Sequence, residues 1–287
     1  MNNISLYCFL CSYAVALAAE LSQFVRRSMF MRLAAILFVL GGFVAHTSYL
    51  LVRSSQHDLP PLLSSTHDWV LVTAWLTVVL YLGVQLWSPR MSIGIFVLPV
   101  VLLLVGAAPF LRQSPNPHVF QMHWWTMVHA SCWSLGIVGV LLALLTSVMY
   151  LVQHYRLKHK RSELPALHLL SLERLSQMNW WLVIISVPLQ TLGVITGLYM
   201  IHLSKAGENP VNLMNLTVGM NGLMWIVMAI LFGWILGAKN ATGRLVAWRT
   251  ILACLYMVLT LVVMKVGSTD GIHGRKLDHQ EMKGDAP

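Results

Sequence analysis

Charged side chains are scarce in this sequence, and acidic ones are the scarcest. Only 10% of the 287 residues are Asp, Glu, Lys or Arg, whereas 57% are hydrophobic. A soluble domain has about 25% charged residues, so a soluble globular fold is excluded and the surplus apolar surface must face lipid. Glu20 is the only carboxylate in the interior of an apolar run, and proton-driven transporters usually place more acids inside the membrane.

Cysteine is also rare, with four residues in the chain. Cys8 and Cys11 form a C-x-x-C near the start of the first apolar run, without the soluble strand–helix context of a redox motif. We therefore interpret them as small apolar helix residues. No C-x-x-C-H occurs, so covalent haem attachment to this chain is not expected. No Ser–His–Asp signature or phosphate-binding loop stands out either.

Apolar runs dominate what the sequence does contain. Eight of them have roughly the 19 to 25 residues that a helix needs to cross a bilayer core. They lie near residues 4–24, 31–52, 68–87, 92–111, 128–152, 180–202, 214–236 and 248–266. Because backbone polar groups cannot stay unpaired in hydrocarbon, the runs should be helices. We predict an all-α polytopic membrane bundle of about eight transmembrane helices, a single domain over residues 1–275 with a polar tail at 276–287.

The basic residues predict how the bundle lies in the membrane. Nothing basic precedes the first run and arginines follow it, so the run is not expected to be a cleaved signal. Twelve of the 19 basic residues fall in the odd-numbered connections. They are Arg26, Arg27, Arg32, Arg90, Arg156, Lys158, Lys160, Arg161, Arg174, Lys239, Arg244 and Arg249. The positive-inside rule then puts both termini outside the cytoplasm. Without a soluble basic face, no nucleic-acid partner is expected.

Three histidines lie in or beside the apolar runs. His46 lies inside the second (GGFVAHTSYLL), His129 at the start of the fifth (WWTMVHASCW) and His273 just after the last (MKVGSTDGIHG). Ionisable groups in or beside a bilayer core are costly, which makes these residues candidates for a functional site. Span counting puts His129 and His273 at the same outer face, and paired imidazoles suit a buried haem iron. For His46, a packing role and a ligand role both stay open.

Four stretches give the chain a resemblance to a known family. WWTMVHASCWSLGIVGVLLALLTSVMYL, LERLSQMNWWLVIISVPLQTLGVITGLYM, MKVGSTDGIHG and HTSYLLVRSSQHDLPP occur in this order. Together they resemble the cytochrome c assembly membrane proteins of the CcsA/ResC type, including their HemX-like shorter members. The likeness covers most of residues 40–275. The family histidines map to His129, His273, His46 and His57.

This resemblance implies a function as well as a fold. It implies an eight-helix protein of a bacterial inner membrane that binds haem b non-covalently, with the iron between His129 and His273. The expected partners are haem, a second assembly membrane protein, apocytochrome c and the lipid bilayer. We expect an accessory to haem attachment rather than an enzyme. The chain departs from the family in HLSKAGENPVNLMNLTVGMNG, which lacks the tryptophan-rich loop, and at Gly233, where a histidine is usual.

Two other functions stay open at this point. A HemX-like membrane regulator of haem biosynthesis would act through its cytoplasmic loop, and a small-molecule transporter would be indifferent to the three histidines. A zinc site is a weaker alternative, because His57, Asp58, His67 and Asp68 cluster in one connection without a tight metal-ligand spacing.

Two expectations concern packing. Leucines at 167, 170 and 175 predict an amphipathic helix on the membrane surface between the fifth and sixth runs. Two pairs of glycines, Gly193 with Gly197 and Gly233 with Gly237, have the spacing that allows close helix contact.

Overall fold

The described part of the chain is built from helices. The computed structural model describes residues 5–23, 28–57, 65–87, 93–111, 123–159, 170–204, 216–237 and 243–267, and the single residues 60, 62 and 113. The elements are α1 (Leu6–Ser22), α2 (Met29–His57), α4 (Thr66–Trp87), α5 (Gly94–Ala107), the 3-10 helix η1 (Ala108–Phe110), α6 (His123–Lys158), α7 (Leu172–Ser204), α8 (Leu216–Gly237) and α9 (Gly243–Gly267).

Six of these helices, α2, α4, α6, α7, α8 and α9, are long and apolar enough to cross a membrane. The other two, α1 and α5, are apolar but shorter. The expected all-α class is confirmed for the described residues, and several helices of spanning length support a multi-pass membrane protein. Each predicted run coincides with a helix. The count of eight spans and the outside position of both termini stay predictions.

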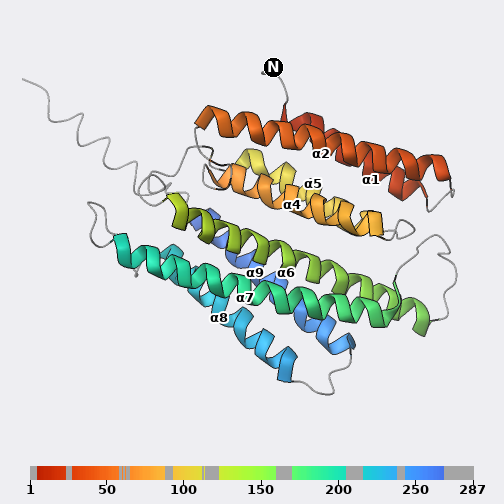
Figure 1. Cartoon of the computed structure of the whole chain (residues 1–287). Coiled ribbons are helices and arrows are strands. Elements are labelled where there is room, and N and C mark those ends of the chain that lie inside the picture. Colours follow the sequence, from red (N-terminus) through yellow and green to blue (C-terminus); the bar gives the residue numbers. More distant parts are fainter. Residues whose placement is uncertain are drawn as a thin grey trace, which may run out of the picture.

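The helices form two groups (Figure 1). One contains α1, α2, α4 and α5, the other contains α6, α7, α8 and α9, and the groups meet where α4 and α5 contact α6. Consecutive helices run antiparallel, so α2, α5, α7 and α9 end where α1, α4, α6 and α8 begin. We call this the His129 end, after the residue near the start of α6. The opposite one is the Glu20 end, after the residue near the end of α1.

The longest helices, α6 and α7, pack against each other along their lengths. With 36 and 33 residues, each extends beyond a ~30 Å hydrocarbon core. The first turns of α7 correct one expectation. Leu175 belongs to this helix and is fully buried in the core of the first group, against which Leu170 also packs. The prediction of a separate surface helix over these two leucines was therefore wrong, because they face the junction of the two helix groups. Residue 167 lies outside the described residues.

The two glycine pairs behave differently. A Cβ atom added at Gly193 would lie 2.8 Å from the Trp133 ring, and one at Gly197 would lie 2.9 Å from the His129 ring. Close approach of α7 to α6 therefore requires both glycines, as predicted. At Gly233 and Gly237 an added Cβ would meet no atom of the described part of the chain within 4 Å. The expected close contact at this second pair was wrong, because α8 lies at the edge of the bundle, where its neighbours are α7 and α9.

Candidate functional site

His129 is held by a single strong hydrogen bond. It lies near the start of α6, and its Nδ1 is 2.7 Å from the backbone oxygen of Gly193 on α7. A carbonyl oxygen can only accept, so Nδ1 carries the proton and donates. The neutral ring then presents Nε2 as a lone pair, for which the described residues provide no hydrogen-bond partner. A histidine whose Nδ1–H is fixed by a carbonyl is the usual form of an imidazole metal ligand.

Helix α7 shapes the surroundings of this ring through its small residues. Gly197 lies against the His129 ring, and Gly193 lies against Trp133 one turn further along α6. The rings of His129 and Trp133 meet edge to face with centroids 6.4 Å apart. The hydroxyl of Thr196 donates to Gly193 O at 2.9 Å, next to the histidine. The orientation of the imidazole is therefore fixed from two sides, while the ring itself is only partly buried.

Aromatic side chains gather at the same end of the bundle. Trp124 is 72% exposed, and Trp125 stacks edge to face on Tyr199 with centroids 4.8 Å apart. Trp125 and Tyr199 come from the start of α6 and the end of α7, so they flank the position of His129. Their exposure suits interfacial anchoring, and an exposed aromatic surface of this kind also suits contact with a flat macrocycle.

The second expected ligand, His273, lies outside the described residues. The helix that leads to it is described: α9 packs along α6 and ends at Gly267 beside the start of α6 (Figure 1). His273 follows that end by six residues. That His129 and His273 lie close together therefore stays a prediction. The direction of α9, which ends at the His129 end, agrees with it.

His46 lies in the other helix group. Its ring is fully buried and stacks on Phe9 of α1 with centroids 4.3 Å apart and nearly parallel planes. Nδ1 lies 3.4 Å from the hydroxyl of Tyr13. Nε2 has no hydrogen-bond partner among the described residues, and the ring lies near the backbone of Leu71 on α4. The contacts of His46 and of His129 come from different helices, so the described residues do not join them in one site.

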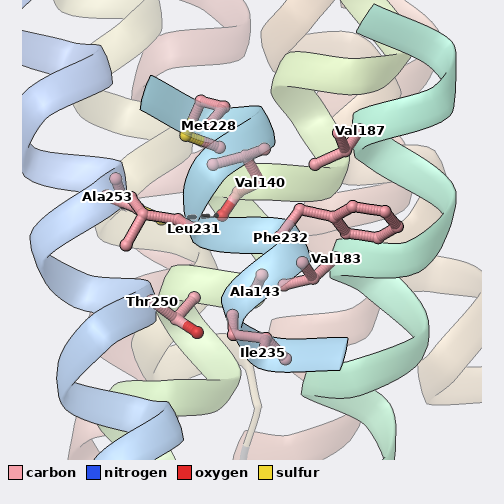
Figure 2. Close-up of a pocket in the computed structure, with 11 residues that line it drawn as sticks. Val140, Ala143, Val183, Val187, Met228, Leu231, Phe232, Ile235, Thr250 and Ala253 are labelled. Carbon is pink, nitrogen blue, oxygen red and sulfur yellow. Dashed lines mark hydrogen bonds between the residues drawn. The ribbon is translucent and has the colours of Figure 1, made fainter. Parts of the chain in front are cut away.

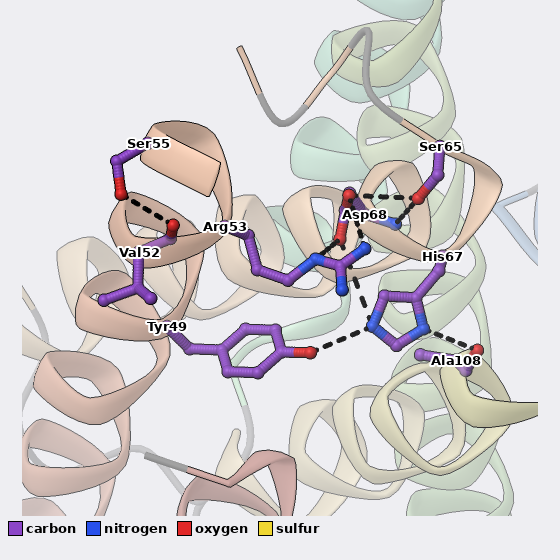
Figure 3. A network of polar contacts seen from close by, with 8 residues as sticks. All are labelled: Tyr49, Val52, Arg53, Ser55, Ser65, His67, Asp68 and Ala108. Atoms are coloured by element: carbon purple, nitrogen blue, oxygen red, sulfur yellow. Dashed lines mark hydrogen bonds and ion pairs between the residues drawn. The ribbon is translucent and has the colours of Figure 1, made fainter. Parts of the chain in front are cut away.

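A further polar cluster joins α2, α4 and η1 at the His129 end of the first helix group (Figure 3). Arg53 Nε lies 2.8 Å from Asp68 Oδ1, and Arg53 Nη2 donates to Asp68 Oδ2 at 3.1 Å. Ser65 caps α4: its hydroxyl accepts from the Asp68 backbone N–H at 3.1 Å and donates to Asp68 Oδ2 at 3.0 Å. Tyr49 OH lies 3.2 Å from His67 Nε2, and His67 Nδ1 donates to Ala108 O at 2.8 Å.

This cluster bears on the zinc alternative. His67 and Asp68 are buried and have protein partners from α2, α4 and η1, while the side chain of His57 and residue 58 lie outside what the structure describes. Sequence reasoning missed Tyr49, Arg53 and Ser65. The S-x-x-D spacing of Ser65 and Asp68 is a capping signal that could have been found. The partners on α2, Tyr49 and Arg53, could not have been found from the sequence.

The described residues contain no group of three or more His, Cys, Asp or Glu side chains that could hold a metal ion. A cavity between α6, α7, α8 and α9 offers no better site (Figure 2). It has a volume of about 20 Å³ and is lined by apolar side chains such as Val140, Met228 and Phe232. A space of this size holds about one water, and apolar walls keep it dry. It is a packing gap between helices.

Comparisons of the chain with protein-family models, with curated proteins and with solved structures find no match.

Proposed function

We propose that this chain is a haem-binding protein of the inner membrane that takes part in c-type cytochrome assembly. It would handle haem at the outer, non-cytoplasmic face of that membrane. The observation that carries the proposal is the geometry of His129. Its Nδ1–H is bound by Gly193 O, and its Nε2 is left as a lone pair at the helix-bundle end where α9 leads to His273. His129 and His273 would be the two axial ligands of the iron.

The residues at this end fit such a cargo. The carbonyl of Gly193 fixes the tautomer that an axial imidazole needs, and Trp125 and Tyr199 offer aromatic surface beside it. Haem itself supplies the iron porphyrin that is passed on to apocytochrome c. This chain would bind the macrocycle, orient it and shield it from water, with a second membrane protein as partner.

The test is a visible absorption spectrum of the purified full chain. We expect a bis-histidine b-type spectrum that is lost in His129→Gly and in His273→Gly. Added imidazole should restore it in either variant, because free imidazole can occupy the space of the missing ring. His154→Gly is the matched control, since this histidine lies on the same helix near the Glu20 end and stacks on Tyr150.

Two outcomes would contradict the proposal. One is a colourless, folded protein that does not take up added haem. The other is a haem spectrum that persists in His129→Gly and in His273→Gly without imidazole. Deleting the gene distinguishes the regulatory alternative: loss of c-type cytochromes supports assembly, while altered tetrapyrrole precursors with normal cytochromes support regulation.

A further inference from the structure

Thr196 on α7 contacts the same carbonyl oxygen that holds His129. Its Oγ1 atom is 3.5 Å from His129 Nδ1, and its hydroxyl has two acceptors on its own helix, Leu192 O at 2.8 Å and Gly193 O at 2.9 Å. Gly193 O also accepts the Nδ1–H of His129, at 2.7 Å. A single carbonyl oxygen therefore lies within hydrogen-bond distance of both side chains.

The Gly193 carbonyl cannot serve all the donors around it at full strength. A carbonyl oxygen has two lone pairs, and inside an α-helix it already faces the backbone N–H four residues further on, here that of Gly197. The protons of His129 and Thr196 share what is left. The hydrogen bond from His129 is therefore weaker while the Thr196 hydroxyl points to Gly193 O, and stronger when that hydroxyl turns to Leu192 O.

The strength of this hydrogen bond acts on the other nitrogen of the ring. When Nδ1–H is drawn more strongly toward its acceptor, more electron density stays in the ring and Nε2 becomes the stronger electron donor. Acceptors behind a metal-bound imidazole tune the metal in this way. Thr196 can therefore act on Nε2 of His129 through Gly193 O, while its own contact with the ring is at Nδ1.

The packing of α6 on α7 keeps the ring beside this carbonyl. A Cβ atom added at Gly197 would lie 2.9 Å from Cε1 of His129, so the imidazole rests directly on the backbone of α7. A change of acceptor by the Thr196 hydroxyl needs only a rotation about its C–O bond. The hydroxyl is therefore the adjustable part of this contact, and the ring and the carbonyl are its fixed parts.

We propose that Thr196 is a positioning residue of the haem site, whose hydroxyl shares the Gly193 carbonyl with His129 and so limits how strongly Nε2 donates to the iron. Strong donation favours ferric over ferrous iron, and hydrogen bonding behind an axial ligand is one of the means by which a protein sets this balance. The inference rests on the proposed haem function and names a residue that regulates the same site.

The test is the reduction potential of haem bound to the full chain, from a redox titration of its visible spectrum. Thr196→Val keeps the branched shape of the side chain and removes the hydroxyl. We expect the ferric-to-ferrous ratio at a given potential to rise roughly two- to fivefold, the effect of part of one hydrogen bond. This is a potential lower by about 20–40 mV, at 59 mV per tenfold for one electron. Thr196→Ser, which keeps the hydroxyl, should titrate like the wild type.

Thr73→Val is the matched control. The Thr73 hydroxyl donates to Trp69 O on its own helix, α4, at 2.9 Å. This variant therefore loses the same group from the other helix group, away from His129. Its haem should titrate like that of the wild type.

Chemical rescue tests whether the effect passes through the N–H of the ring. In His129→Gly, added imidazole supplies an N–H that Gly193 O can accept, whereas 1-methylimidazole also offers a nitrogen to the iron but has no N–H. Adding Thr196→Val should lower the potential in the presence of imidazole and leave it unchanged with 1-methylimidazole. A general effect of Thr196 on packing or polarity would shift the potential with both.

The proposal is overturned by an unchanged or higher potential in Thr196→Val, or by equal shifts with the two rescue ligands. A wild type that takes up no haem overturns the proposed function, and this inference with it. The two failures are therefore distinguished by whether the wild type is coloured.

Discussion

Three buried or half-buried histidines of the described helices differ in what their ring nitrogens contact. His67 has both nitrogens engaged, with Tyr49 and with Ala108 O. His129 has Nδ1 bound to Gly193 O and Nε2 open. His46 has Nδ1 near Tyr13 and a face covered by Phe9. The same side chain can therefore fasten helices, offer a metal ligand or pack as a core residue, depending on partners from other helices.

The environment of His46 predicts a packing role. Replacing it with Phe keeps a ring stacked on Phe9 but leaves the Tyr13 hydroxyl unpaired, so His46→Phe should lower the free energy of unfolding by about 1 kcal/mol. Adding Tyr13→Phe removes both polar partners, and the double variant should regain most of this loss. Reversible denaturation in detergent measures both values, and the haem spectrum should be unchanged in the double variant. Loss of that spectrum would instead make His46 a ligand.

At the scale of helices, α6 and α7 show what close packing requires. The Trp133 ring is 8% exposed and fills the space over Gly193. A side chain there would have to push the two longest helices apart. Over Gly233 the space is open, so the same change on α8 meets no neighbour among the described residues.

This difference predicts opposite effects of one substitution at two sites. Gly193→Ala should lower the thermal unfolding midpoint, because an overpacking cost of about 1–3 kcal/mol exceeds the gain in helix propensity of about 0.5–1 kcal/mol. Gly233→Ala should gain the propensity term alone and raise the midpoint. Equal shifts in the two variants would contradict the packing seen between α6 and α7.

The positions of the helices could be predicted from apolar runs, because their length reflects the thickness of the bilayer rather than any partner. The run at 68–87 and α4 (Thr66–Trp87) almost coincide. The extra turns of α7 were missed because its first residues are polar, and only the packing of Leu175 against the other group shows that they are helical. The role of Gly193 depends on its contact with Trp133 on another helix, so no local pattern contains it.

For the whole molecule, the charges of the described residues are distributed unevenly between the two ends. Arg32, Arg156, Lys158, Arg174, Arg244 and Arg249 belong to helix termini at the Glu20 end. At the opposite end, the described helices carry two basic residues, Arg53, which is neutralised by its ion pair with Asp68, and Lys265 in the last turn of α9. By the positive-inside rule the Glu20 end should be cytoplasmic. The aromatic cluster around His129 would then face the outside, where the proposed haem handling takes place.

Labelling of single cysteines tests this orientation directly. In a background without the four native cysteines, Ser5→Cys and Lys158→Cys place exposed thiols at the His129 end and at the Glu20 end. A membrane-impermeant maleimide applied to spheroplasts should label Ser5→Cys at once and Lys158→Cys only after permeabilisation, because charged reagents do not cross the bilayer. The reverse pattern would turn His129 toward the cytoplasm. Haem bound there could not be presented at the outer face, so an assembly role would fail even if both imidazoles bind iron.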